Sequence, residues 1–384
     1  MAARPGSEVS GKQPGRRKVV VAGALGVVGR AAVEHFAAAG DSVIGLSRRK
    51  PDFGSSAEFV AVDLRDAQAC RTSLEPHADA SHLFYAALHE KPRLVEGWFD
   101  PDHTATNLAM LCNLLDTIES PALEHVTLLQ GTKAYGAHLG GPMRVPAKER
   151  EPRVEHTNFY FAQEDWLRER HRGRDWRFTI LRPQIVTGLA VGSAMNVVAT
   201  IGVYAAIQRE RGLPFAHPGH PHAITELSDA ALVARAADWA AGRAECDGEV
   251  YNLTNGDVVC WRELFRAVAA WLGVPLDEST APARLAETMP AQAGLWRRIA
   301  EREGLRITDL DQLIGLSWQY ADVLWANPHA AERPGLVSTI KARQHGFDHC
   351  LDSEDNVIEL LERMRVERYL PDCGARSALV GASG

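Results

Sequence analysis

The feature that most constrains the fold of this chain is a glycine pattern near its start. Gly23, Gly26 and Gly29 directly follow the apolar run 19–22 and open a stretch with helical periodicity at 27–39. Glycine permits the tight turn and close backbone approach that a pyrophosphate needs, and the helix N-terminus offers free N–H groups. This strand–turn–helix context predicts a dinucleotide-binding unit at the start of a parallel sheet.

Short apolar runs and helical patterns alternate through the first half of the chain. The apolar runs lie at 42–46, 59–62, 82–86, 126–129 and 178–181, and helical patterns between the later runs lie at 66–74, 104–119 and 160–171. Strands that alternate with helices are typical of a parallel sheet covered on both faces. We therefore predict an α/β fold whose core is a Rossmann-like, doubly wound parallel sheet.

The rhythm changes after residue 188, where helical patterns dominate and the run 250–253 has the character of a short strand. This change predicts a smaller, mostly helical C-terminal substrate domain. The expected boundaries are a disordered tail at 1–17, a dinucleotide-binding domain at 18–188, the substrate domain at 189–373 and a frayed tail at 374–384.

Charge balance and cysteine usage exclude several classes of protein. With 42 Lys+Arg against 49 Asp+Glu the net charge is -7, which argues against a nucleic-acid partner. The six cysteines show no CxxC spacing, so we expect free thiols and a cytoplasmic protein.

The histidine-rich stretch 217–222 has no accompanying carboxylate or cysteine pattern, so we expect no metal. No run approaches the about 20 apolar residues of a bilayer span, so we expect no membrane contact. The oligomeric state stays open, with a homodimer as one possibility.

The end of the second apolar run indicates which dinucleotide is bound. An NAD-binding unit has an acidic residue here for the ribose 2′-hydroxyl, whereas this chain has Ser47, Arg48 and Arg49. Arginine binds a 2′-phosphate through paired charged hydrogen bonds, so we predict NADP(H). Asp63, after the third run, either meets the adenine edge of the cofactor or caps the next helix, and it can do both.

The catalytic residues depart from the commonest pattern of short-chain dehydrogenases. These enzymes usually carry Tyr-x-x-x-Lys on one helix, and none of the seven tyrosines here has a lysine four residues later. The chain is therefore either not such a catalyst or a variant of one.

Two segments resemble a known family in which the catalytic residues of short-chain dehydrogenases are arranged differently. The sequences VTLLQGTKAY at 126–135 and NFYFAQED at 158–165 resemble motifs of the progesterone 5β-reductase/iridoid synthase-like family of atypical extended short-chain dehydrogenases/reductases. The glycine turn, the arginine pair and later segments match the same family in order, over residues 18–350. The resemblance implies NADPH-dependent reduction of activated C=C bonds in small enones or enals.

The resemblance, together with the glycine and arginine patterns, gives a set of expected site residues. For the cofactor they are Gly23, Leu25, Gly26, Val27, Gly29, Ser47, Arg48, Arg49, Asp63, Leu64, Ala86, Ala87, Gln130, Lys133, Pro183, Val186, Ser193 and Met195. For catalysis, Lys133 would stabilise the oxyanion that forms when hydride adds to the β-carbon, beside Tyr160 and Phe161. Tyr135 is a substitute proton donor if the strand continues that far, because alternate strand residues share a face.

One departure from the family pattern affects the expected chemistry. The family's catalytic tyrosine is the second aromatic residue after Phe in NFYY, and that position is Phe161 here. Because one helical step turns a side chain by about 100°, we expect Tyr160 not to take over the role unless the backbone shifts. Two alternatives stay open. One is redox-neutral enolate chemistry, an aldol, retro-aldol or isomerisation step with NADP(H) bound. The other is an NADP(H)-binding sensor without turnover.

Overall fold

Seven parallel strands form the central sheet of the computed structural model, which describes residues 16–279 and 282–372. In spatial order they are β11 (Glu249–Leu253), β6 (Arg177–Pro183), β5 (His125–Leu129), β4 (His82–Tyr85), β1 (Lys18–Ala22), β2 (Ser42–Ser47) and β3 (Glu58–Ala61). The apolar run of β1 is buried on both faces, which a parallel sheet between helices requires. The predicted doubly wound α/β fold is confirmed.

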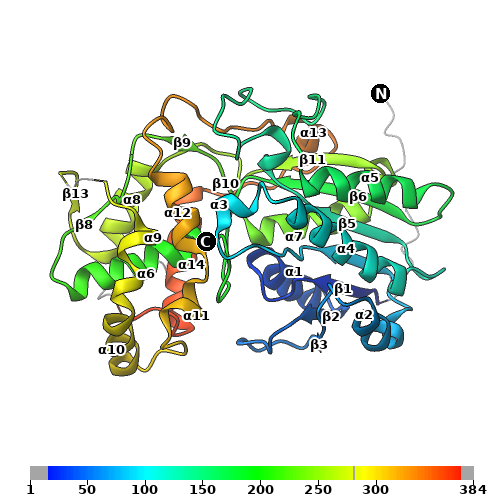
Figure 1. Cartoon of the computed structure of the whole chain (residues 1–384), viewed down its shortest axis with the longest axis horizontal. Helices are drawn as coiled ribbons and strands as arrows, with labels where there is room; N and C mark the ends of the chain where they lie inside the picture. The colour runs from blue at the N-terminus through cyan, green and yellow to red at the C-terminus, as the bar shows by residue number, and fades with distance from the viewer. Residues whose placement is uncertain (1–15, 280–281, 373–384) are drawn as a thin grey trace, which may run out of the picture.

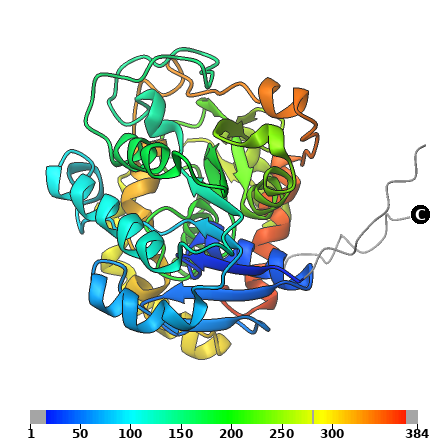
Figure 2. The same cartoon turned by 90° about the vertical axis from the view of Figure 1, so that its right-hand side faces the viewer.

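Helices cover both faces of this sheet (Figure 1). One face packs against α2 (Ala67–Leu74), α4 (Pro101–Ile118) and α5 (Phe159–His171), and the other packs against α1 (Val27–Ala38) and α7 (Ala230–Ala241). Figure 2 shows α4 and α5 on one side of the strands and α7 on the other. Because all strands run the same way, their carboxyl ends share one edge, where ligands of such folds bind.

A helical region lies beside the sheet, on the left of Figure 1. It contains α6 (Val197–Glu210), α8 (Trp261–Leu272), α9 (Leu285–Thr288), α10 (Ala293–Glu303), α11 (Leu310–Ile314), α12 (Ser317–Trp325) and α14 (Ser353–Val366). These helices enclose a separate apolar core that includes Trp261, Trp296 and Trp325. The smaller helical region expected after the sheet is therefore present.

Short elements complete the chain. They are α3 (Leu94–Gly97), α13 (Ile340–Gln344), the strand pairs β7 (Ile185–Thr187) with β10 (Leu227–Asp229), β8 (Phe215–Ala216) with β13 (Leu276–Asp277) and β9 (Ile224–Thr225) with β12 (Val259–Cys260), and the 3₁₀ helices η1 (Glu75–His77), η2 (Thr132–Tyr135), η3 (Ala244–Cys246) and η4 (Pro290–Gln292). Of these, α3 and η2 bear directly on the site described below.

Two expectations about boundaries differ from the structure. Arg17, expected in the N-terminal tail, forms ion pairs of 2.6 Å with both Asp41 and Asp238, so the ordered chain begins before residue 18. The strand expected in the helical region is β11, which pairs with β6 and completes the sheet. The chain therefore returns to the sheet after entering the helical region. Residues 1–15 and 374–384 of the two expected tails lie outside the described part of the chain, as does residue 373.

Two further findings concern the described residues. Cys70, Cys112, Cys246, Cys260 and Cys350 are free thiols. Among residues 16–279 and 282–372, no helix has both the length and the apolar character that crossing a bilayer would take.

Candidate active site

The glycine turn between β1 and α1 is as tight as its sequence predicts. Gly23 has φ +80°, and a Cβ there would lie 2.7 Å from the carbonyl oxygen of Ala86 on the neighbouring chain segment. A Cβ at Gly29 would lie 2.0 Å from the carbonyl oxygen of Gly23. Larger residues would therefore fill or break this turn, and the N-terminus of α1 points its free N–H groups at the same place. The turn fits the pyrophosphate of a dinucleotide.

One cavity of about 650 Å³ runs from this turn along the carboxyl edge of the sheet to the helical region. Every residue expected to contact the cofactor lines it: Gly23, Leu25, Gly26, Val27, Gly29, Ser47, Arg48, Arg49, Asp63, Leu64, Ala86, Ala87, Gln130, Lys133, Pro183, Val186, Ser193 and Met195. Residues from the separate sequence motifs therefore line one and the same cavity.

Positive charge gathers at one end of the cavity. Arg48 and Arg49 follow β2 and are exposed, and the Arg49 side chain donates a hydrogen bond of 2.8 Å to the carbonyl oxygen of Val191. Asp63 lies in the same wall, where hydrogen bonds from Arg65 lower its pKa to about 2. The Asp63–Arg65 ion pair, 2.6 Å long, offsets the negative charge of this carboxylate. Arg65 was not among the expected site residues, although it stands two positions after Asp63.

Lys133 lies at the other end, in η2, directly after β5. Its side chain is 13% exposed, and its ammonium nitrogen lies 3.8 Å from the centre of the Trp98 ring and 3.5 Å from Glu90 Oε1. Burial lowers the pKa of Lys133 to about 8, while the Glu90 carboxylate opposes that shift. The ammonium nitrogen is itself buried, and its nearest carboxylate among the described residues is Glu90, while Lys133 as a residue lines the cavity wall.

Tyr160 and Phe161 occupy different surroundings at the start of α5. Tyr160 lines the cavity, whereas Phe161 is absent from the cavity wall and packs under the guanidinium of Arg153, 4.8 Å from the ring centre. Phe161, the residue expected at the position of the family's phenol, therefore lies outside the cavity wall. The helical step separates the two side chains as expected, but the face of α5 that meets the cavity is the face of Tyr160. Burial raises the pKa of Tyr160, so its hydroxyl stays protonated.

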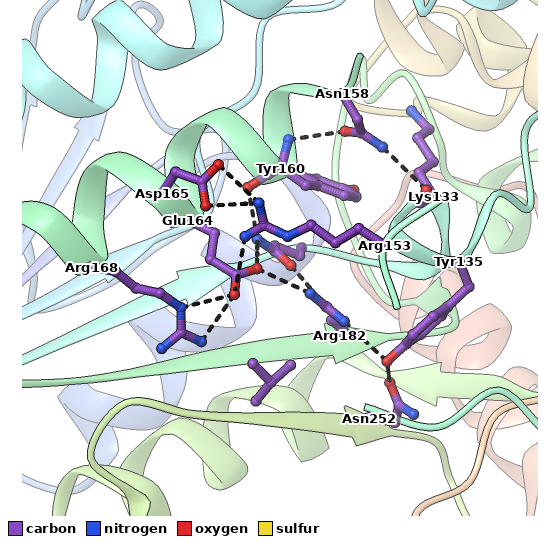
Figure 3. Close-up of polar contacts among 12 residues, drawn as sticks. Lys133, Tyr135, Arg153, Asn158, Tyr160, Glu164, Asp165, Arg168, Arg182 and Asn252 are labelled. Carbon is purple, nitrogen blue, oxygen red and sulfur yellow. Dashed lines mark hydrogen bonds and ion pairs between the residues drawn. The ribbon is translucent and has the colours of Figure 1, made fainter. Parts of the chain in front are cut away.

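Asn158 ties Tyr160 to Lys133, as Figure 3 shows. It caps α5, because its side-chain oxygen accepts a hydrogen bond of 2.9 Å from the Tyr160 backbone N–H. Its amide nitrogen donates 3.1 Å to the Lys133 carbonyl oxygen. One side chain therefore fixes the backbone of both candidate catalytic residues.

Tyr135 does not serve as the substitute donor. The chain turns into η2 after β5, so Tyr135 is not two positions further along a strand from Lys133. Its hydroxyl is buried, donates 2.6 Å to Asn252 and accepts 3.2 Å from Arg182 (Figure 3). Tyr135 is also absent from the residues that line the cavity. Its hydroxyl therefore bonds to Asn252 and Arg182 rather than to the cavity.

A buried polar network supports this end of the cavity. Gln130 donates 2.9 Å to the Tyr160 carbonyl oxygen and accepts 2.8 Å from Arg182. Arg182 in turn pairs with Glu164 at 3.1 Å, and Arg168 pairs with the same carboxylate at 2.9 Å (Figure 3). The network joins β5, β6 and α5 and thereby holds Tyr160 relative to the sheet.

Three residues of this cavity wall that were not in the expected set bear on the site. Glu90 and Trp98 surround the ammonium of Lys133, and Tyr320 lines the opposite helical side from α12. Glu90 follows the carboxyl end of β4 by a few residues, which is a position where ligand-binding residues of parallel sheets occur. Trp98 and Tyr320 carried no such signal, because isolated aromatic residues usually belong to the core.

Comparisons with known proteins show which family this chain belongs to. Residues 19–254 match the model of the NAD dependent epimerase/dehydratase family. An (S)-8-oxocitronellyl enol synthase of Camptotheca acuminata is 28% identical, over 92% of this chain and 93% of its own. The 3-oxo-Delta(4,5)-steroid 5-beta-reductase of Arabidopsis thaliana is 28% identical, over 92% of each chain. The resemblance drawn from the motifs is confirmed.

Solved structures agree on the fold. The UDP-glucose 4-epimerase of Thermus thermophilus, in complex with NAD, superposes with TM-score 0.63 at 19% identity over 91% of this chain and 99% of that one. Epimerase Mth375 of Methanothermobacter thermautotrophicus gives 0.66 at 17% identity over 92% and 93%. From the matched family model, the similar relatives and this shared fold, the chain belongs to the NAD dependent epimerase/dehydratase family and is an oxidoreductase of the short-chain dehydrogenase/reductase superfamily.

Proposed function

We propose that this protein is an NADPH-dependent reductase of activated C=C bonds in enones or enals. The observation that carries the proposal is Lys133, a residue with a buried ammonium that lines the same cavity as the glycine turn and the arginine pair. A positive charge held in an apolar cavity stabilises an oxyanion far better than it would in water. The similarity to a 3-oxo-Delta(4,5)-steroid 5-beta-reductase supports the same substrate class.

The glycine turn would hold the cofactor pyrophosphate, and Arg48 with Arg49 would bind a 2′-phosphate. When bound, the nicotinamide supplies a hydride. Lys133 would neutralise the negative charge that develops on the carbonyl oxygen of the substrate, and the protonated hydroxyl of Tyr160 would donate a hydrogen bond to the same atom. The proton that completes the saturated product can come from water at the substrate's α-carbon.

The cavity wall around Lys133 suits an apolar substrate with one carbonyl group. Its apolar members include Trp98, Phe159, Leu316, Tyr320, Val323 and Leu324. Such a wall binds a hydrocarbon body by burying its surface, while a small number of polar groups orient the reacting end. We therefore expect cyclic or terpene-like enones and enals to react better than small hydrophilic ones.

Two other functions compete with this proposal. Redox-neutral enolate chemistry was suggested by Phe161, but Phe161 is absent from the cavity wall and Tyr160 lines it, so that reason is gone. A sensor that binds NADP(H) without turnover would not need a lysine ammonium held without a hydrogen bond at the cavity. Both make distinct predictions: turnover without NADPH oxidation in the first case, and binding without turnover in the second.

The test is an assay of NADPH oxidation with a panel of enones, enals and saturated ketones, with products identified by mass. We expect loss of the reduced nicotinamide absorbance with the unsaturated substrates and formation of saturated carbonyl products. Oxidation with the saturated ketones alone, or conversion of substrate at constant NADPH, would reject the proposal.

A further inference from the structure

Glu90 is a buried carboxylate that the proposed chemistry does not use directly. It lies between β4 and α3, lines the cavity, and its side chain is 5% exposed. Trp98 Nε1 lies 3.3 Å from Oε1 and donates to it, and His103 Nε2 lies 3.0 Å from Oε2. A buried carboxylate with each oxygen contacted by a different side chain is fixed in direction. Its position is therefore specified by the fold.

The Glu90 carboxylate is directed at Lys133. Its Oε1 atom lies 3.5 Å from the Lys133 ammonium, and the Trp98 ring that holds this oxygen through its N–H also lies beneath the ammonium. Carboxylate, indole and ammonium therefore form one triangle. The buried ammonium is confined on two sides, by the negative charge of Glu90 and by the negative face of the Trp98 ring, within a residue that lines the cavity.

Four other titratable groups lie around this triangle, on the loop after η2, on α4, on α5 and on α12. His138, from the loop after η2, has its pKa lowered to about 4 by burial and by the charge of Lys133. Burial raises the pKa of Tyr160 on α5 and of Tyr320 on α12, so both remain neutral. His103, on α4, is hydrogen-bonded to Glu90 itself. Among the described residues at this end of the cavity, Glu90 is thus the carboxylate that faces the ammonium.

We propose that Glu90 is a positioning residue that keeps Lys133 protonated inside the apolar cavity and directs its ammonium toward the substrate oxygen. Without a counter-charge, an ammonium taken out of water loses its proton readily, and a neutral amine cannot stabilise an oxyanion. The inference rests on the proposed function for its catalytic meaning. The protonation of Lys133, however, can be measured without any turnover.

The test is the pH dependence of Lys133 acetylation in the full-length protein without substrate. A brief pulse of acetic anhydride labels only the neutral amine, and mass spectrometry of the Lys133 peptide gives the midpoint. We expect a wild-type midpoint near pH 8. Glu90→Gln should lower it by about 1–3 pH units, the effect of one opposite charge at this distance. Glu90→Asp, which retains the charge, should restore most of the wild-type midpoint.

Matched variants distinguish this role from a structural one. Glu96→Gln makes the same change on α3, in an exposed ion pair with Arg93, and should leave the midpoint unchanged. Trp98→Phe keeps a ring beneath the ammonium but removes the N–H that holds Glu90, and should lower the midpoint by less than Glu90→Gln. The Trp98→Phe variant also tests the inference if the Glu90→Gln protein fails to fold. Folding of each variant is checked by circular dichroism.

An unchanged or raised midpoint in folded Glu90→Gln would overturn the inference, and so would an unchanged midpoint in Trp98→Phe if Glu90→Gln does not fold. If enone reduction occurs, the basic limb of kcat/KM against pH should move in the same order as the midpoints. A lowered midpoint in an enzyme that reduces no enone would reject the proposed function while leaving the role of Glu90 toward Lys133 intact.

Discussion

Tyr160 and Phe161 adjoin in the chain, yet a single helical step gives them different chemistry. The phenol of Tyr160 lines the cavity near Lys133, and the ring of Phe161 lies beneath Arg153 away from it. In the proposed mechanism, Lys133 supplies charge and Tyr160 supplies a neutral hydrogen-bond donor. That mechanism needs no hydroxyl group at position 161.

We predict opposite effects from two substitutions at these adjacent positions. Tyr160→Phe removes an oxyanion donor and should lower kcat for enone reduction by about 10- to 1,000-fold. Phe161→Tyr, the matched control, adds a hydroxyl outside the cavity and should give no gain. Steady-state kinetics with NADPH checks both. A rate increase in Phe161→Tyr together with full activity in Tyr160→Phe would mean that the other face of α5 meets the substrate.

Arg65 gives a second prediction at the scale of single residues. It neutralises Asp63 beside Arg48, and Arg65→Ala would leave the Asp63 carboxylate uncompensated near the expected 2′-phosphate. The Kd for NADPH should rise about tenfold, equivalent to about 1.4 kcal/mol, while the Kd for NADH changes little. Fluorescence titration measures both. Arg71→Ala on α2, an exposed residue bonded to Gln68, is the control. Equal weakening of both cofactors would contradict this account.

The residues that sequence could identify are those whose signals are local. The glycine turn and the arginine pair were predictable because strand, turn and helix follow one another within a few positions. The face of α5 that meets the cavity was not predictable, because helical periodicity tells which residues share a face but not which face meets a cavity. The role considered for Tyr135 depended on the strand continuing that far, and the chain leaves β5 for η2 before this point.

At the scale of elements, the Arg182–Glu164 network fixes α5 against the sheet. Burial by itself raises the pKa of Glu164, but Arg182, Arg168 and Arg153 outweigh burial and lower it below its ordinary value of 4.5. A carboxyl whose pKa is lowered on folding stabilises the protein above its unfolded pKa. That stabilisation is lost as the pH falls through the folded value.

We predict that Glu164→Gln lowers the free energy of unfolding by about 3–5 kcal/mol at pH 7, because it leaves buried Arg182 without its counter-charge. The difference from wild type should shrink as the pH falls from about 4.5 through the lower folded-state pKa of Glu164, since the wild-type carboxylate then becomes protonated as well. Urea titrations at several pH values measure this. Asp165→Asn, the next residue and an exposed partner of Arg153, should cost at most about 1 kcal/mol. A loss in Glu164→Gln that does not change with pH would contradict the electrostatic explanation.

Element order was largely predictable, but the assignment of elements to the sheet was not. The strands from β1 to β6 were expected in sequence because their apolar runs alternate with helices. The strand β11 was recognised as a strand, yet its partner β6 lies far away in the sequence. Strand pairing at that distance depends on how the intervening helices pack, which a local pattern does not contain.

At the scale of the whole molecule, the cavity joins the two parts of the fold. The sheet contributes the glycine turn and Lys133, and the helical region contributes Leu316 and Tyr320. The loop that carries Ser193 bridges them, because its carbonyl oxygen accepts 2.8 Å from Ser317 at the start of α12. A ligand in the cavity therefore contacts both parts at once and should stabilise the whole chain.

We predict that NADPH at 100 times its Kd raises the free energy of unfolding by about 2.7 kcal/mol. NADH at the same concentration should raise it less, because it lacks the 2′-phosphate. In the double variant Arg48→Ala with Arg49→Ala the difference between the cofactors should vanish. Chemical denaturation with each cofactor checks this. Equal stabilisation of the wild type by NADPH and NADH would remove the assigned role of the arginine pair.

The central claim is that hydride from NADPH adds to the β-carbon of an enone while Lys133 stabilises the oxygen. The most direct measurement uses NADPH deuterated at the transferred position and locates the deuterium in the product by NMR and mass. The account predicts a saturated carbonyl product with deuterium on the β-carbon, formed about 100- to 1,000-fold more slowly by Lys133→Met. Deuterium on the carbonyl carbon, or product without deuterium, would contradict it.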